Sequence, residues 1–237
     1  MNLKRFLGKC RRGVDIVTLN AHASYSQVGE DRVVNYLFET LNITNPTYLD
    51  IGTNYPLVGN NTYLFYDKGC RGVCIEPDPE MVKQIKKKRP GDKILNVGIG
   101  ITNTANAPFY LFPGNVVGWS TFSKEEAEIR EKESGLIPKV ISIPLMTVND
   151  VIAANFNPYP NFISLDVEGL DLAILKSMDF QRFRPDAICV ETISFSITNT
   201  EEKLNDTIDF MHTQGYVTYA DTHVNTIFCK NELFNKK

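Results

Sequence analysis

The sequence has no run of 18 apolar residues, so it offers no segment long enough to form a transmembrane helix. Cysteine is scarce, with five residues in 237 and no C-x-x-C spacing, which argues against a disulfide framework and against a zinc site. Positive charge is not in excess either, because the net charge is −3. A broadly basic surface for nucleic acid is therefore not expected.

The composition is that of an ordinary globular protein, with 43% hydrophobic and 22% charged residues. Residues 1–24 begin with five basic and no acidic residues in the first 13, and no apolar stretch follows, so this basic segment is not a secretory signal. A solvated tail or short amphipathic helix is expected there, with a membrane-surface anchor as the alternative. Residues 25–237 are expected to form one domain. Cys74, Cys189 and Cys229 lie in apolar runs, and buried reduced thiols are typical of a cytoplasmic protein.

Short β-branched runs alternate with helical patterns along most of the chain. This alternation predicts an α/β fold with a doubly wound, mostly parallel sheet and ligands at the carboxyl ends of its strands. The expected strands are residues 47–51, 72–75, 93–97, 162–165 and 187–190, and the expected helices are 61–68, 79–88, 170–177 and 201–214. Residues 216–219 and 226–229 are expected to form a closing β-hairpin.

One segment departs from this pattern. The 30 residues between Lys93 and Lys124 include no Asp, Glu, Lys or Arg, and residues 108–123 are rich in aromatic side chains and glycine. Aromatic rings and uncharged hydrogen-bonding groups suit a polyhydroxylated ligand, so residues 108–145 are expected to be an insertion that covers an acceptor site. The alternative is a pair of extra strands that covers the sheet edge.

Two features at expected strand ends indicate a nucleoside cofactor. Asp50-Ile-Gly-Thr-Asn54 follows the first strand, where Gly52 permits a tight turn and lets a ligand approach the main chain. Glu76 ends the second strand, where its carboxylate can accept hydrogen bonds from two ribose hydroxyls. The loop is not the dinucleotide fingerprint G-x-G-x-x-G, which would require a glycine at Asn54.

These features belong to an ordered set of motifs. In chain order the set is 26–31 (SQVGED), 48–54 (YLDIGTN), 61–62 (NT), 72–77 (GVCIEP), 96–98 (NVG), 119–121 (WST) and 162–169 (FISLDVEG). From about Ser26 to Glu191 the chain resembles the FkbM family of S-adenosylmethionine-dependent methyltransferases. It departs from the family at Thr53, often alanine, and at Asp171, often glutamate. The resemblance implies a class I, Rossmann-like sheet of seven strands and S-adenosylmethionine as the cofactor.

The resemblance also implies roles for individual residues. The loop with Asp50, Gly52 and Asn54 would hold the methionine moiety and the ribose edge, Glu76 the ribose hydroxyls, and Asp166 would lie next to the sulfonium and the cofactor amino group. Residues near the adenine would be Pro77, Asp78, Asn96, Val97 and Gly98. The implied cofactor site further includes Gln27, Glu30, Asn61 and Thr62. For Gln27 and Glu30, helix capping or an ion pair is the alternative.

A hydroxyl acceptor needs a base, since its pKa lies far above neutral. The candidates are Asp166, Glu168 and Glu191 at strand ends and His223 at the tip of the hairpin. A helix cap is the alternative for Glu168, and an exposed loop histidine is the alternative for His223. Asp166 and Glu168 could instead bind a divalent metal, but further ligands are not visible in the sequence, and no metal site is expected.

We expect S-adenosylmethionine-dependent O-methylation of a sugar hydroxyl. The expected acceptor is a small molecule, a nucleotide-linked sugar for bacterial capsule or surface polysaccharide, which Trp119, Ser120 and Thr121 would bind. Arg130, Lys132, Lys139 or the N-terminal cluster would meet its phosphates. A homo-oligomer is compatible with the sequence.

Two alternative functions are compatible with an α/β sheet of this kind. The first is a nicotinamide-dependent sugar oxidoreductase or epimerase, which usually carries Tyr-x-x-x-Lys, a spacing that no tyrosine of this chain matches. The second is a non-catalytic cofactor-binding domain, which the intact Asp50, Gly52, Glu76 and Asp166 disfavour.

Overall fold

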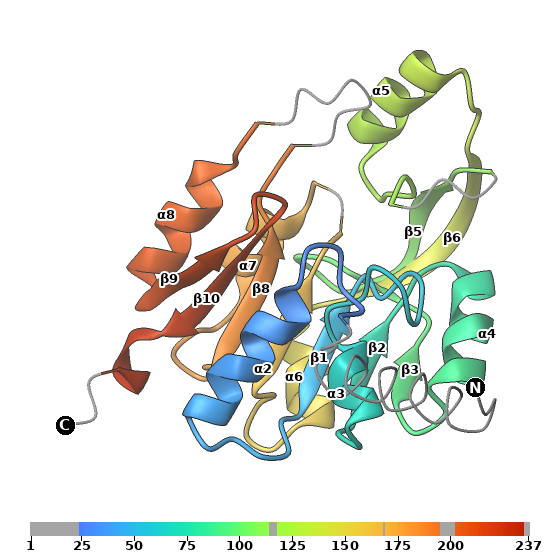
Figure 1. Cartoon of the computed structure of the whole chain (residues 1–237). Coiled ribbons are helices and arrows are strands. Elements are labelled where there is room, and N and C mark those ends of the chain that lie inside the picture. Colours follow the sequence, from blue (N-terminus) through green and yellow to red (C-terminus); the bar gives the residue numbers. More distant parts are fainter. Residues whose placement is uncertain (1–23, 114–117, 168, 195–201, 235–237) are drawn as a thin grey trace, which may run out of the picture.

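A seven-stranded sheet forms the centre of the computed structural model, which describes residues 24–113, 118–167, 169–194 and 202–234 (Figure 1). Its strand order is β3-β2-β1-β7-β8-β10-β9. The strands are β1 (Tyr48–Ile51), β2 (Gly72–Ile75), β3 (Lys93–Leu95), β7 (Phe162–Leu165), β8 (Ala187–Glu191), β9 (Tyr216–Asp221) and β10 (Asn225–Lys230). Neighbours from β3 to β8 run parallel, and β10 is antiparallel to both β8 and β9. The predicted doubly wound sheet with a closing hairpin is confirmed.

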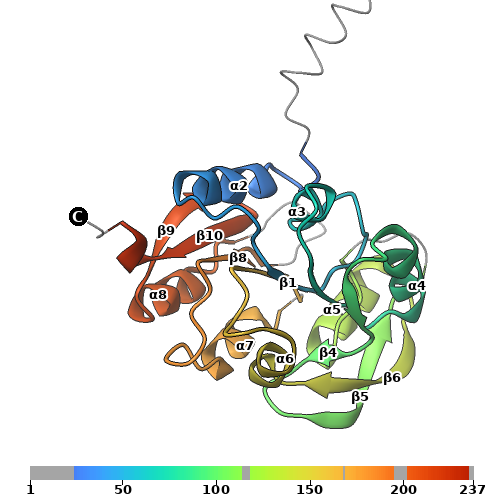
Figure 2. The same ribbon diagram turned by 90° about the horizontal axis from the view of Figure 1, so that it is seen from below.

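Helices cover both faces of this sheet (Figure 2). Helices α2 (Glu30–Thr40) and α3 (Tyr63–Asp67) pack on one face, where they meet buried side chains such as Tyr48 and Phe162. Helices α6 (Val148–Asn155), α7 (Asp171–Ser177) and α8 (Asn205–Thr213) pack on the other, against side chains such as Leu49 and Ile163. Successive strand residues point to opposite faces, so strands covered on both sides are apolar throughout. This is why the central strands could be found from the sequence.

The charge-free part of the chain contributes to a second sheet. It has three strands in the order β4-β6-β5, with β4 (Gly98–Ile99), β5 (Thr104–Leu111) and β6 (Lys139–Met146), and β5 runs antiparallel to β6. Helix α5 (Lys124–Ser134) lies between β5 and β6 in the chain. Its first turn is capped by Ser123, whose hydroxyl accepts a hydrogen bond from the Glu126 N–H. Extra strands, the alternative expectation for this region, are therefore present.

The last helix begins later than its sequence pattern suggests. The prediction of a helix over 201–214 is wrong at its start, because α8 begins at Asn205. The residues before it pair with the segment that follows β8: the Leu204 N–H donates to the Thr192 carbonyl, and the Ser194 N–H donates to the Glu202 carbonyl. This long-range pairing overrides the local helical pattern.

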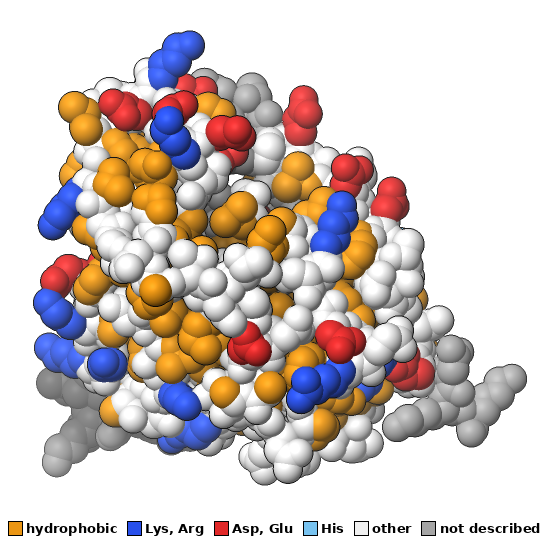
Figure 3. Space-filling view, turned by 180° about the vertical axis from the view of Figure 1, so that it is seen from behind, with side chains coloured by type: hydrophobic (Ala, Val, Ile, Leu, Met, Phe, Trp, Pro, Cys, Tyr) orange, Lys and Arg blue, Asp and Glu red, His pale blue; other side chains and the backbone are white. Residues whose placement is uncertain are grey.

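The predictions about membrane spans, cysteines and surface charge can be compared with the part of the chain that the structure describes. No helix in it is long and apolar enough to cross a membrane. Its four cysteines are free and buried. On the face shown in Figure 3, Lys and Arg side chains are scattered among Asp and Glu. The basic segment expected over 1–24, including Cys10, lies outside the described residues apart from Ser24.

The central position of Phe162 leads to a stability prediction. This side chain is fully buried, and its ring packs against those of Phe38 and Phe65 at centroid distances of 6.4 and 5.6 Å. We expect Phe162→Ala to lower the free energy of unfolding by about 3–5 kcal/mol, since it removes buried surface and leaves a cavity. Urea denaturation measures the loss. Phe234→Ala, at a residue that is 53% exposed, is the matched control and should change it by less than about 1 kcal/mol.

Candidate active site

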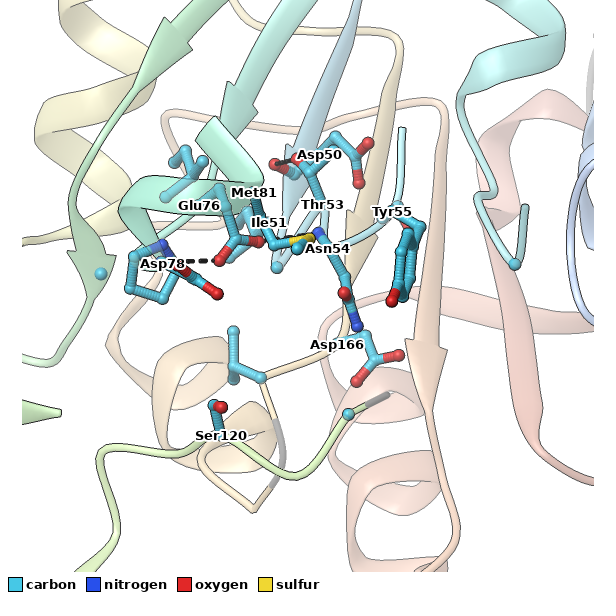
Figure 4. Close-up of a pocket in the computed structure, with 18 of the residues that line it drawn as sticks. Asp50, Ile51, Thr53, Asn54, Tyr55, Glu76, Asp78, Met81, Ser120 and Asp166 are labelled. Carbon is cyan, nitrogen blue, oxygen red and sulfur yellow. Dashed lines mark hydrogen bonds between the residues drawn. The ribbon is translucent and has the colours of Figure 1, made fainter. Parts of the chain in front are cut away.

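A cavity lies at the carboxyl ends of the parallel strands β1, β2, β7 and β8. This is the point at which the order of strand addition changes from one side of β1 to the other. The strands run outward from β1 to β3, and the chain then returns to β7 on the other side of β1, which is where ligands bind in such sheets. The cavity is lined by strand-end residues on one side and by the second sheet and its connections on the other. Figure 4 shows Asp50, Glu76 and Asp166 around it.

The loop after β1 is shaped by Gly52. Its φ of +80° is a left-handed conformation, and a Cβ atom here would lie 1.9 Å from the Asp166 carbonyl oxygen. The N–H groups of Gly52 and Thr53 both donate to the Ile75 carbonyl, at 3.0 and 3.1 Å. The loop therefore passes between the ends of β2 and β7 with its main chain against the cavity, and a side chain at position 52 would not fit.

Glu76 is buried at the end of β2, with 5% of its surface exposed. Its Oε2 accepts a hydrogen bond from the Asn54 N–H at 2.7 Å, and its Oε1 accepts one from the Asp78 N–H at 2.8 Å. Burial raises the pKa of Glu76 to about 7, against the opposing effect of these two hydrogen bonds. Each oxygen keeps a further lone pair for a ligand, so the carboxylate suits a pair of neighbouring hydroxyls.

The implied adenine residues surround Glu76. Asp78 caps α4 (Pro79–Lys88), accepting from the Glu80 N–H at 2.8 Å, and lines the cavity with Pro77. Asn96 donates to the main-chain carbonyls of Glu76 and Pro77 at 3.0 and 2.8 Å, so it fixes this turn. Gly98 lines the cavity, whereas Val97 packs against the core. Ile51, Ile75, Ile99 and Met81 add an apolar surface suited to a base.

Asp166 follows β7 on the same side of the cavity as the end of β8. Burial, with a smaller contribution from the negative charges of Asp171 and Asp50, raises the pKa of Asp166 to about 7. Asp171 accepts hydrogen bonds from the Val167 and Gly169 N–H groups, which shapes the turn after the strand. Glu191 also lines the cavity. Glu168 lies outside the described residues.

Asn61 and Thr62 occupy different positions. Asn61 lines the cavity and donates to the Ser164 hydroxyl at 3.1 Å. Thr62 is fully buried behind the cavity wall, where its hydroxyl donates to Asp50 Oδ2 at 2.7 Å.

Gln27 and Glu30, the two residues of the 26–31 motif that the resemblance assigns to the cofactor, lie in different places. Gln27 lines the cavity, but Glu30 is buried away from it. Glu30 accepts hydrogen bonds from the Thr222 hydroxyl at 2.7 Å and the Asn225 amide at 3.0 Å. Burial opposes its ionisation, yet these hydrogen bonds lower the pKa of Glu30 overall. Glu30 thus ties α2 to the closing hairpin, in keeping with the structural alternative.

His223 lies at the tip of that hairpin, exposed and outside the set of residues that line the cavity. Its main-chain N–H donates to Asp221 Oδ1 at 2.7 Å. The structure therefore does not bring His223 together with Asp166 and Glu191.

The opposite wall comes from the charge-free segment. Its cavity-lining residues, aromatic, aliphatic or small and hydroxyl-bearing, are Phe109, Leu111, Phe112, Gly118, Ser120, Thr121 and Phe122. Trp119 is not among them, and its ring packs against Phe112 at 6.0 Å. The sequence points to the aromatic segment as a whole and to residues 119–121 in particular, and of these three Ser120 and Thr121 line the cavity. The burial alternation along β5, with Ala107 and Phe109 buried and Pro108 exposed, is the signal that distinguishes Phe109 within the segment.

Arg130 does not serve as an accessible cation. It is fully buried, and its Nη1 donates to the main-chain carbonyls of Gly118 and Trp119 at 3.2 and 2.7 Å. The expectation that it meets acceptor phosphates is wrong, because the guanidinium holds the loop before α5. Lys132 and Lys139 are exposed. Within the described ranges, no group of three His, Cys, Asp or Glu side chains is placed to hold a metal ion.

The chain is similar to known proteins in family and in fold. The methyltransferase FkbM domain matches residues 50–218. A TehB-like S-adenosylmethionine-dependent methyltransferase from Corynebacterium glutamicum is 10% identical, with 97% of this chain and 100% of that chain covered and a TM-score of 0.42. An RNA methyltransferase from Salinibacter ruber in complex with S-adenosylhomocysteine is 11% identical, with 84% and 89% covered and a TM-score of 0.38.

A third similar structure is magnesium protoporphyrin IX methyltransferase from Synechocystis with bound S-adenosylmethionine. It is 9% identical, covers 85% of this chain and 78% of its own, and has a TM-score of 0.41. A comparison with curated proteins returned no match.

The residues at the cavity fit the cofactor of this family. Gly52 leaves the main chain open to a ligand, Glu76 retains acceptor capacity for two hydroxyls, and Asp50 and Asp166 offer negative charge to a cation. The matched region covers more than half of the chain, and it contains all of these residues. The protein belongs to the FkbM family of S-adenosylmethionine-dependent methyltransferases.

Proposed function

We propose that the protein methylates a hydroxyl group of a sugar, and that the acceptor is a nucleotide-linked sugar used for bacterial capsule or surface polysaccharide. The observation that carries the proposal is the two-sided cavity. Carboxylates at strand ends form one wall, and uncharged aromatic and hydroxyl side chains of residues 109–122 form the other. The family assignment removes the nicotinamide-dependent alternative and the non-catalytic one.

The wall formed by the strand-end carboxylates, the cofactor wall, would bind the ribose and the positively charged end of the cofactor. When bound, S-adenosylmethionine supplies a methyl group on a positively charged sulfur. Glu76 would hold the ribose hydroxyls, and Asp50 and Asp166 would face the charged end of the molecule. Positive charge in the cavity lessens the repulsion among these buried carboxylates, which favours the cofactor over neutral nucleosides.

The opposite wall suits a sugar. Rings such as Phe109, Phe112 and Phe122 can pack against the C–H faces of a pyranose, while Ser120 and Thr121 offer hydrogen-bonding groups at the cavity. No residue of this wall carries a charge, so it favours a neutral polyhydroxylated group over a charged one. The exposed Lys132 and Lys139 remain candidates for the phosphates. A nucleotide-linked sugar as the acceptor and the buried free thiols both favour the cytoplasm as the place of reaction.

Asp166 is the base that the geometry favours. Its carboxylate lies at the cavity, and none of the described residues donates a hydrogen bond to it. Burial raises the pKa of Asp166 above that of an exposed aspartate, which makes its carboxylate a stronger base. Glu191 shares the cavity and is the second candidate. Holding the acceptor oxygen, the methyl carbon and the leaving sulfur in line would contribute further to the rate, since pre-organised geometry is worth roughly 7–11 kcal/mol in favourable models.

The direct test of this function is a reaction of the purified protein with S-adenosylmethionine and a panel of nucleotide sugars, followed by mass spectrometry. We expect one sugar to gain the mass of a methylene group and to release S-adenosylhomocysteine in equal amount. Methylation of a nucleic acid, a protein or a non-sugar metabolite, with every sugar unchanged, would contradict the proposal.

Cofactor binding is expected to depend on Glu76 and on pH. Glu76→Gln removes charge-assisted hydrogen bonds to the ribose and should weaken S-adenosylhomocysteine binding by roughly 1.5–3 kcal/mol. Because the pKa of Glu76 is raised to about 7 and ligand hydroxyls favour the ionised form, wild-type affinity should fall as the pH drops below about 7. Titration calorimetry between pH 6 and pH 8, about one unit on either side of the pKa of Glu76, measures both effects.

Glu80→Gln on α4 is the matched control, because Glu80 is exposed and pairs only with Lys83 at 2.6 Å. It should leave the affinity unchanged. If Glu76→Gln binds like the wild type at every pH, the ribose is bound elsewhere.

Turnover should identify the base. Asp166→Asn is expected to lower kcat by ~10²–10⁴-fold, since the acceptor proton loses its recipient, and to weaken cofactor binding as well. Glu168→Gln, Glu191→Gln and His223→Ala are expected to stay within about tenfold of the wild type. Steady-state kinetics with the sugar that accepts the methyl group compares the four variants with the wild type. A larger loss at any of the other three positions would transfer the role to that residue.

A further inference from the structure

A buried arginine lies directly behind the cofactor loop. Arg89 is the C-cap residue of α4, and none of its surface is exposed. Its Nε donates to Asp92 Oδ2 at 2.8 Å, and its Nη1 donates to Asp50 Oδ2 at 3.2 Å. A guanidinium without solvent must find such partners within the protein, so its position is set by both carboxylates.

The hydrogen bonds on Asp50 all arrive at one oxygen. Oδ2 accepts from the Asn60 amide at 3.1 Å, from the Thr62 hydroxyl at 2.7 Å and from Arg89. No described residue donates to Oδ1. Asp50 lines the cavity (Figure 4), whereas Thr62 and Arg89 are not among the residues that line it. The carboxylate is therefore held from behind by one oxygen and keeps the other for a ligand.

Arg89 also orients the other two donors. Its Nη2 donates to the Thr62 hydroxyl at 2.8 Å, and its Nη1 donates to Asn60 Oδ1 at 3.2 Å. A hydroxyl that accepts from a guanidinium turns its own proton the other way, which here is towards Asp50. An asparagine that accepts through its oxygen presents its NH₂ group to Asp50 in the same manner. One guanidinium thus sets three donors on the same oxygen.

We propose that Arg89 is a positioning residue for the amino-acid end of the cofactor: it keeps Asp50 turned so that Oδ1 accepts a hydrogen bond from the ammonium group of the ligand. Asp92 serves as its anchor. It accepts from the Tyr48 hydroxyl at 2.9 Å and from the Gly72 N–H at 2.9 Å, and it does not line the cavity. The proposal rests on the role assigned to Asp50 and is independent of the acceptor.

The affinities for two ligands, one with the amino-acid group and one without it, distinguish a positioning role of Arg89 from a merely structural one. S-Adenosylhomocysteine carries the ammonium group, whereas 5′-methylthioadenosine has the same adenosine and thioether without the amino acid. The readout is the ratio of their dissociation constants, measured by titration calorimetry on folded protein. We expect Arg89→Met and Asp50→Asn each to weaken S-adenosylhomocysteine on the order of 10-fold or more, with 5′-methylthioadenosine changed by less than about threefold.

The controls use the same network. Asp92→Asn weakens the anchor of Arg89, so it should lower the unfolding temperature and shift the ratio in the same direction as Arg89→Met, but by less. In the double variant Arg89→Met with Asp50→Asn, the ratio should match that of Asp50→Asn, because the arginine acts through that carboxylate. Arg71→Met, at an arginine stacked on Tyr66 at 4.6 Å, should change neither affinity.

An equal loss of both ligands in Arg89→Met, or a ratio that Asp50→Asn leaves unchanged, would overturn the proposal. If Arg89→Met does not fold, Arg89→Lys takes its place, since lysine keeps the charge but cannot reach Asp50, Asn60 and Thr62 together. A shift of the ratio by about threefold or more is then expected, and an unchanged ratio overturns the proposal. These are binding measurements, so they stand whether or not any sugar is methylated.

Discussion

The crowding of carboxylates at one end of a parallel sheet is the constraint on which this site depends. Asp50, Glu76, Asp166 and Glu191 end or follow four neighbouring strands, and the strand order brings them to one cavity. Burial raises the pKa of both Glu76 and Asp166 to about 7, so the empty site holds negative charge at an energetic disadvantage. Hydrogen bonds from main-chain N–H groups offset part of this energetic disadvantage at Glu76, and the ion pair with Arg89 offsets part of it at Asp50. A positively charged cofactor offsets more, and this is why such an arrangement is suited to a sulfonium ligand.

The two walls of the cavity come from different parts of the fold and have different tasks. The strand ends at which we propose that the cofactor binds are fixed by the main sheet, where hydrogen-bonded register sets their spacing. The aromatic wall comes from β5 and from the connection between β5 and α5, outside the main sheet. Changes in that wall can alter the acceptor without disturbing the cofactor site. Arg130, buried against the carbonyls of Gly118 and Trp119, shows that the wall is itself anchored.

Much of the main sheet could be predicted from the sequence, because strands buried on both faces are continuous apolar runs and the helices between them carry clear end signals. The start of α8 could not, since Leu204 and Glu202 pair with residues near β8 rather than with their neighbours. The motif residues of the cofactor wall were found, and Asp50 and Glu76 lie at the cavity. Arg89 was missed because a basic residue at a helix C-terminus is ordinarily solvated, and only the fold shows that it points inward to Asp50. Glu30 and His223 were grouped with the site by motif and topology, but three-dimensional packing places Glu30 against the hairpin and His223 in solvent.

If the strand-end carboxylates each hold a different part of the cofactor, a crystal structure of the protein with S-adenosylhomocysteine will show the contacts. Both ribose hydroxyls should donate to Glu76, the ammonium group should donate to Asp50 Oδ1, and the Arg89–Asp50 ion pair should be unchanged. A ribose bound away from Glu76, or an ammonium group without contact to Asp50, would contradict this role of the carboxylates.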